Sequence, residues 1–262
     1  MINLLRTDFY RLIKNKLVLI SLIVAAAFPF VIAAAFCGLK ALVSLGGEEM
    51  GDIIDAVLDS HMLVASTFSF TNNFGIALPI FATILVMADI NSGTIRNKII
   101  LGYSRHKIFL SHFITSLAYC LVLITVYAGM TALWSVVFLK TGDISAERVR
   151  SLIYFYILGL LLYAMVAAIA TSLSLVTFSS VGSIILTIVL CMSIGLATQL
   201  VAAFDYSKFE NIVNFVPAFV VGVFQMSEIN TTMFLESLVG TIVFGALFYV
   251  LGTFGFSKKD LK

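Results

Sequence analysis

Long uncharged runs alternate along this chain with short polar stretches, and each run has about the length of a membrane-crossing helix. A helix needs about 20 apolar residues to cross roughly 30 Å of hydrocarbon. The runs therefore predict six spans. Their approximate bounds are residues 17–39, 62–88, 108–139, 151–177, 182–204 and 237–257.

Two apolar segments do not correspond to one span each. The stretch from Ser151 to Phe204 is uncharged and too long for one helix, and the Ser and Gly residues of "TFSSVGS" (Thr177 to Ser183) predict a turn within it. Residues 211–227 are apolar but too short for a full crossing and contain Pro217. This segment predicts a re-entrant or interfacial helix before the sixth span.

The first 16 residues have a helical rather than a continuous apolar pattern. Apolar residues share one face of this predicted helix, while Arg6, Arg11 and Lys14 lie largely off it. The apolar face consists of Ile2, Leu5, Phe9, Leu12 and Ile13. Such a pattern is typical of an amphipathic helix that lies on a membrane surface.

Composition supports a polytopic membrane protein. The chain is 61% hydrophobic and 11% charged, with a mean hydropathy of +1.09, whereas a soluble domain is near a quarter charged. So few charged residues cannot cover a core of this size with polar surface. We therefore predict an all-α membrane fold, with residues 1–262 forming one transmembrane domain.

The distribution of basic residues predicts the orientation. If both termini, the 89–107 loop and the 177–183 turn face the cytoplasm, that side holds 11 of the 16 basic residues and 3 of the 14 acids. An excess of Lys and Arg marks cytoplasmic loops, so both termini are expected there. The net charge of +2 is too small to suggest a nucleic-acid partner.

Several catalytic and binding motifs are absent from the sequence. It has no Gly-x-x-x-x-Gly-Lys-Ser/Thr loop for nucleotide phosphates, no His-Glu-x-x-His and no Cys-x-x-Cys. Cys37, Cys120 and Cys191 lie in apolar stretches without metal-ligand spacing. No catalytic residue, metal site or cofactor is therefore expected in this chain.

The predicted spans also lack acids and bases at mid-membrane depth. Ion-coupled transporters usually keep such a group to bind the driving ion, although backbone carbonyls can bind sodium instead. A transport role would then draw its energy from another polypeptide. A secondary transporter or channel that works without an ATPase is the alternative.

The 89–107 loop combines four basic residues with an apolar stripe. Ile95, Ile99 and Tyr103 recur at four-residue intervals, as on one face of a helix. Gly93 and Gly102 bracket this segment and allow sharp turns of the chain. Asp89 precedes it and is placed to pair with a nearby basic residue.

The segment "GTIRNKIILGYSRHKIFLS" closely resembles the first cytoplasmic loop of bacterial ABC-2-type transporter permeases. The matching positions are Asp89 (commonly glutamate in that family), Gly93, Thr94, Ile95, Arg96, Asn97, Lys98, Gly102, Ser104 and Arg105. The closing "FGFSKKDLK" is also similar to the family's C-terminal end.

The resemblance implies a subunit of an ATP-driven exporter in the bacterial cytoplasmic membrane. Two permease copies, or this chain and a related permease, would pair above two cytoplasmic ATP-binding subunits that carry ATP and Mg. The loop would hold a coupling helix that docks into the ATPase. The residues implied in this docking are Asp89, Gly93, Thr94, Ile95, Arg96, Lys98, Ile99, Gly102, Tyr103 and Arg105.

Docking would bury the stripe of Ile95, Ile99 and Tyr103, while Arg96, Lys98 and Arg105 would meet acids or helix C-termini at the rim. The substrate would be an amphipathic or hydrophobic molecule such as a peptide, lipid or drug, moved outward. A buried unpaired amide is costly, so Asn72 and Asn73 in the second span are expected either to form hydrogen bonds between helices or to line the substrate's path. Glycines 240, 245, 252 and 255 in the sixth span would let helices or subunits approach closely.

Overall fold

The computed structural model describes residues 1–44, 60–69, 74–139, 146–216 and 229–259, and the regular structure within these ranges is α-helical throughout. Six of the described helices are long and apolar enough to cross a membrane. They are α2 (Lys16–Ser44), α5 (Phe74–Asn91), α7 (Arg105–Phe138), α8 (Ala146–Thr177), α9 (Ser180–Val213) and α11 (Thr231–Lys258). The prediction of six spans is confirmed, and the chain is a multi-pass membrane protein.

The turn between the fourth and fifth spans lies where the Ser- and Gly-rich sequence predicts it. Helix α8 ends at Thr177, and Phe178 has a left-handed backbone with φ of 56°. The Ser179 side chain then caps α9, because its Oγ accepts a hydrogen bond from the Gly182 N–H at 3.3 Å. A hydroxyl at this position satisfies one of the N–H groups that a helix start leaves unpaired.

The second span differs from the continuous helix predicted over residues 62–88. The structure divides it into α4 (Ser60–Ser66) and α5, and residues 67–69 are not helical. The Ser66 and Thr67 hydroxyls both donate to the Leu63 carbonyl, at 2.8 and 3.2 Å, and Phe68 N–H donates to the Ala65 carbonyl. These local bonds replace the regular helical pattern and end α4. Asn72 and Asn73 lie outside the described residues.

The fifth span continues beyond its predicted end at residue 204, because α9 extends to Val213. Charged residues in this extension mark the end of the apolar run but do not stop a helix, and the sequence offers no helix breaker before Asn214 and Pro217. The first three residues of the predicted re-entrant segment, 211–213, are thus the end of α9. Residues 217–227 of that segment lie outside the described residues.

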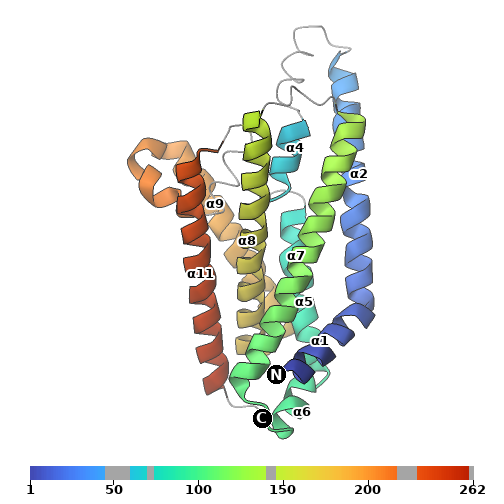
Figure 1. Cartoon of the computed structure of the whole chain (residues 1–262), viewed down its shortest axis with the longest axis vertical. Helices are drawn as coiled ribbons and strands as arrows, with labels where there is room; N and C mark the ends of the chain where they lie inside the picture. The colour runs from blue at the N-terminus through green and yellow to red at the C-terminus, as the bar shows by residue number, and fades with distance from the viewer. Residues whose placement is uncertain (45–59, 70–73, 140–145, 217–228, 260–262) are drawn as a thin grey trace.

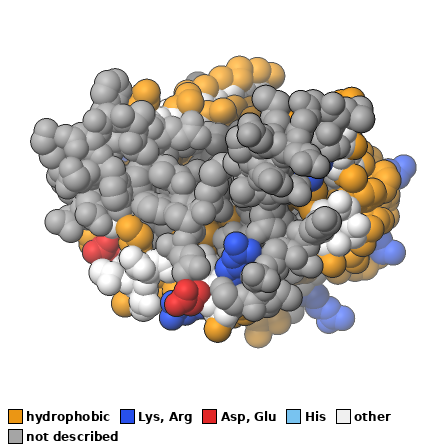
Figure 2. Space-filling view, turned by 90° about the horizontal axis from the view of Figure 1, so that it is seen from above, with side chains coloured by type: hydrophobic (Ala, Val, Ile, Leu, Met, Phe, Trp, Pro, Cys, Tyr) orange, Lys and Arg blue, Asp and Glu red, His pale blue; other side chains and the backbone are white. Residues whose placement is uncertain are grey.

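Helix α8 is the centre of the bundle and packs against α5, α7, α9 and α11, while α2 packs on the far side of α7 (Figure 1). Leu158, Leu162, Val166 and Ile169 of α8 are fully buried in the core. The outer faces of the peripheral helices are apolar as well, and hydrophobic side chains form much of the visible rim in Figure 2. Such a surface is suited to contact with lipid.

Three of the four glycines noted in the sixth span serve packing within the chain. A Cβ atom on Gly240 would overlap the Phe215 carbonyl, one on Gly252 would overlap Ser172, and one on Gly255 would approach Val176. Gly245 has open space beside it.

Two shorter helices lie at the end of the bundle that also holds the N-terminus and the C-terminal end of α11 (Figure 1). They are α1 (Ile2–Lys14), which contacts α7, and α6 (Thr94–Ile100), which joins α5 to α7. The N-terminus and the end of α11 lie at one end of the bundle (Figure 1), which agrees with an even number of spans. That this end faces the cytoplasm stays a prediction from the positive-inside pattern.

Candidate functional site: the connector between the second and third spans

The connector, residues 89–107, folds back sharply at both ends of α6. Gly93 and Gly102 adopt left-handed backbones with φ of 69° and 83°. Such values suit glycine because it has no Cβ to clash. Gly93 and Gly102 therefore both adopt a conformation that favours glycine. The two turns that they form place α6 across the end of the bundle.

The apolar stripe of the connector faces the chain's own spans, which corrects the expectation that a partner buries it. Ile95 is 1% exposed, and Ile99 and Tyr103 pack with it in a cluster. The other members of this cluster include Val86, Ile108, Phe109, Leu175 and Phe256. Helical periodicity identifies an apolar face, but it does not distinguish contact with the same chain from contact with another.

The outward side of the connector carries a second pair of large apolar side chains. Ile100 is 81% exposed and Leu101 is 75% exposed. The side chains of Arg96 and Lys107, on the same connector, are also exposed. The surface available to a partner is thus centred on Ile100 and Leu101.

Lys98 does not lie at an exposed rim, which is a second correction. Its side chain is buried, and Nζ donates to both carboxylate oxygens of Asp8 in α1, at 2.7 and 2.9 Å. Asp8 Oδ2 also accepts a hydrogen bond of 2.6 Å from Ser111 Oγ in α7. A buried charge requires such partners, because an unpaired ion in the interior is strongly destabilising. The two charges compensate each other and join α1, α6 and α7.

His112 completes this buried group of polar side chains. Its Nε2 lies 3.2 Å from Lys98 Nζ, and its Nδ1 lies 3.7 Å from Asp89 Oδ2. An ammonium group can only donate, so Nε2 is the acceptor and the ring proton of the neutral imidazole is on Nδ1. The ring therefore connects Lys98 to the second carboxylate, Asp89.

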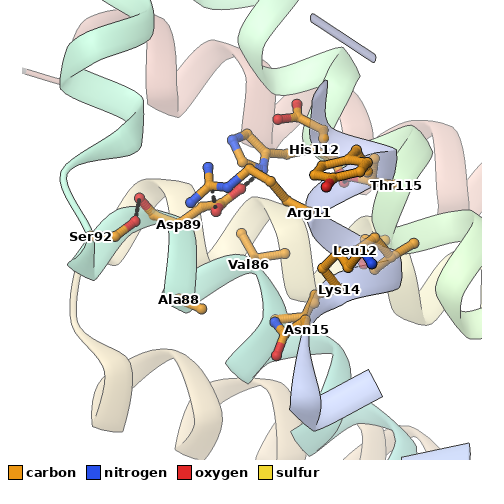
Figure 3. A pocket seen from close by; sticks show the side chains of 14 residues that line it. Arg11, Leu12, Lys14, Asn15, Val86, Ala88, Asp89, Ser92, His112 and Thr115 are labelled. Carbon is orange, nitrogen blue, oxygen red and sulfur yellow. Dashed lines mark hydrogen bonds and ion pairs between the residues drawn. The ribbon is translucent and has the colours of Figure 1, made fainter. Parts of the chain in front are cut away.

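Asp89 forms the salt bridge that the sequence predicts for it. Its Oδ1 lies 3.0 Å from Arg11 Nη1, so that α5 is bound to α1 (Figure 3). The Arg11 side chain is 39% exposed, so this pair is more accessible to solvent than the Asp8–Lys98 pair. A cavity of about 300 Å³ lies beside the salt bridge, between α1, α5 and α7.

Arg105 contacts a helix C-terminus, but that helix belongs to the same chain. Its Nη1 donates to the carbonyl oxygens of Phe256 at 3.2 Å and Ser257 at 2.9 Å, and also to that of Lys259. Phe256 and Ser257 belong to the last turn of α11, where carbonyls have no i+4 N–H partner within the helix, and the Phe256 carbonyl also accepts from Lys259 N–H. Lys259 in turn donates to the carbonyls of Val176 and Thr177 at the end of α8.

The remaining predicted residues have smaller roles in this geometry. Thr94 Oγ1 lies 2.8 Å from Ser92 Oγ at the start of α6. The described residues contain no group of three or more His, Cys, Asp or Glu side chains that could hold a metal ion. The geometry is that of a short helix held against the spans by buried contacts.

Sequence reasoning missed Asp8, Ser111 and His112 as parts of this site. Asp8 is the only acid of α1, and it lies on the same helical face as the buried Leu4. An acid that is buried beside apolar residues requires a basic partner. The position of Asp8, one turn after Leu4, could therefore have predicted a buried ion pair. Which of the connector's four basic residues would reach Asp8 depends on the fold.

One known protein family matches most of the chain. The model of a family described as "Protein of unknown function (DUF2705)" matches residues 18–262, and so includes the connector and all six spans but not α1. A search of curated proteins finds no match. The protein belongs to the DUF2705 family of multi-pass membrane proteins, whose function is unknown.

Proposed function

We propose that this chain is the membrane-spanning subunit of an ATP-driven exporter of the bacterial cytoplasmic membrane. Support comes from the resemblance of residues 93–111 to the coupling loop of ABC-2-type permeases. The chain contains no P-loop, so ATP and Mg would be bound by two separate cytoplasmic subunits. A second copy of this chain, or a related permease, would complete the membrane domain.

One observation carries the proposal: the inner face of the connector is fixed to the spans, while its outer face exposes apolar side chains. Ile95 and Lys98 fix α6 to the spans, while Ile100 and Leu101 remain exposed at its end. Burial of a large aliphatic side chain contributes about 1.5–3 kcal/mol. A partner with an apolar groove and an acidic rim would bury Ile100 and Leu101 and meet Arg96 and Lys107.

The bracing gives the docked helix a route to the spans. Movement of α6 would pull on α1 through Lys98 and on α11 through Arg105, because both contacts join the connector to other helices. The long uncharged spans favour an amphipathic or hydrophobic substrate, such as a peptide, lipid or drug. Outward transport follows from the resemblance alone.

The experiment replaces Ile100 with Asp in a tagged chain that is expressed in its own host, and it measures how much ATP-binding subunit co-purifies. We expect at least ten-fold less ATPase subunit to co-purify, because about 1.5–3 kcal/mol of apolar burial is lost. The matched control is Ser104→Asp, which adds the same charge nearby at the N-cap of α7, where Asp is equally suitable.

Two outcomes would contradict the proposal. Retention of the ATPase subunit by the Ile100→Asp chain would remove the connector as its docking site. If the unaltered chain, purified from its own membrane, carries no ATP-binding subunit and still moves substrate in vesicles, the protein is a secondary transporter or channel.

A further inference from the structure

The cavity of about 300 Å³ between α1, α5 and α7 is of the size that holds small ligands. It lies where a surface helix meets the spans, at the end of the bundle that holds α6 (Figures 1 and 3). Next to it, α1 exposes the apolar side chains of Ile2, Tyr10 and Ile13. These side chains are suited to the boundary between lipid headgroups and acyl chains, which places the cavity at the same depth.

The polar lining of the cavity is rich in hydrogen-bond donors. Lys14 forms no side-chain ion pair or hydrogen bond with another described residue. Arg11 uses only Nη1 on Asp89, and the rest of its guanidinium remains available. Asn15 accepts from Leu17 N–H through Oδ1, which leaves its amide N–H groups to donate.

The charges around the cavity favour an anion. Its two acids are already paired, Asp8 with Lys98 and Asp89 with Arg11. Lys14 adds a positive charge that no acid of the described residues neutralises. An oxygen-rich anion could accept from Lys14 and from the free Arg11 nitrogens, and phosphate oxygens suit a guanidinium especially well.

One part of the wall is apolar, formed by Leu12, Leu85, Val86 and Ala88, while Ser92, His112 and Thr115 add polar groups elsewhere. A free inorganic ion gains nothing from such a wall, whereas the glycerol and first methylenes of a lipid do. We propose that this cavity binds the phosphodiester headgroup of an anionic phospholipid, with Arg11 and Lys14 on the phosphate and the apolar wall along the glycerol. Basic pockets between spanning helices on the cytoplasmic side are suited to anionic headgroups.

The test measures the melting temperature of the purified full chain with added lipid. Phosphatidylglycerol at about a hundred times its Kd should raise the melting temperature by roughly 5–10 °C, and phosphatidylcholine should raise it far less. Inorganic phosphate and glycerol phosphate form a third arm. If they stabilise the chain as strongly as the lipid does, the ligand is water-soluble and the lipid assignment is wrong.

Two variants identify the site. Ala88→Trp fills the cavity from the exposed face of α5 without removing a charge, and Lys14→Gln removes the unpaired cation. Each should abolish most of the difference between the two lipids. Lys107→Gln is the control, because Lys107 is an exposed cation that does not line the cavity. If Lys107→Gln reduces the difference as much as Lys14→Gln does, or if neither site variant reduces it, the proposal fails.

Discussion

The Asp8–Lys98 pair is an ion pair from which water is almost excluded, with 2% and 6% of the two side chains exposed. Taking both charges out of water costs several kcal/mol, and their attraction offsets this cost only when geometry and further hydrogen bonds are good. Here Ser111 and His112 supply those further bonds. The pair therefore contributes little net stability, but the loss of one member would leave a buried, uncompensated charge.

We predict that Lys98→Met lowers the free energy of unfolding by about 3–5 kcal/mol. The double variant Asp8→Leu/Lys98→Met should be more stable than Lys98→Met alone, because it leaves no buried charge. Denaturation in detergent without anionic lipid measures both. Arg11→Gln is the control and should cost about 1 kcal/mol or less, since the Arg11 side chain is 39% exposed. Additive costs in the double variant would show that the two residues do not act as a pair.

At the residue scale, the sequence predicts which positions matter better than it predicts what they contact. Gly93, Gly102 and Asp89 have the conformations or the partner that the sequence indicates. The predicted contacts of Lys98 and Arg105 with a partner were wrong, because both side chains contact their own chain instead. A basic side chain in a cytoplasmic loop can do either. Only the positions of Asp8 and of the end of α11 decide between these two possibilities.

Among the elements, α8 and α11 form a closely packed pair in which a small residue sets the distance. Gly252 faces Ser172, whose Oγ donates to the Phe248 carbonyl at 2.8 Å. Glycine permits this approach and brings a hydroxyl of one helix within reach of a carbonyl of the next. The contact requires a residue without a side chain at position 252.

We predict that Gly252→Ala destabilises the protein by about 1–3 kcal/mol, because the added Cβ overlaps Ser172 and forces the helices apart. Gly245→Ala, the same change two turns earlier on α11, should be neutral or stabilising by up to about 1 kcal/mol, since its Cβ meets no atom and alanine is the better helix former. Thermal unfolding in detergent compares the two. Equal destabilisation would mean that position 245 is packed as well, as in a dimer through Gly245.

Element number and order follow from the apolar runs, but two element boundaries do not. The division of the second span into α4 and α5 depends on hydroxyl-to-carbonyl bonds at Leu63, which hydropathy does not register. The extension of α9 to Val213 shows the reverse case, in which a helix continues after its apolar run ends. Hydropathy reports the environment of a segment, whereas local hydrogen bonding determines where a helix stops.

For the whole molecule, the positive-inside pattern predicts that the end of the bundle holding the connector faces the cytoplasm. In a chain with its three cysteines replaced, we predict that Leu101→Cys is shielded from an impermeant thiol reagent in intact cells and reacts after permeabilisation. Glu147→Cys, exposed at the start of α8, should react in intact cells. Both positions are accessible, so a lack of labelling reports the side of the membrane. Labelling of Leu101→Cys from outside would reverse the topology and exclude docking of an ATPase at the connector.

The central place of α8 also bears on how the protein is made. Two of its neighbours, α9 and α11, are translated after it, and the carbonyl that Ser172 binds is 76 residues downstream. Until α11 leaves the translocon, the face of α8 that α11 covers, which includes Ser172, has no protein partner from this chain. Arg105 and the end of α8 likewise acquire the last contacts described above only with residues 256–259. A nascent chain that stops before α11 would expose the Ser172 hydroxyl and its neighbours on α8 to the bilayer. Membrane quality-control proteases could recognise this exposed polar face and degrade the incomplete chain.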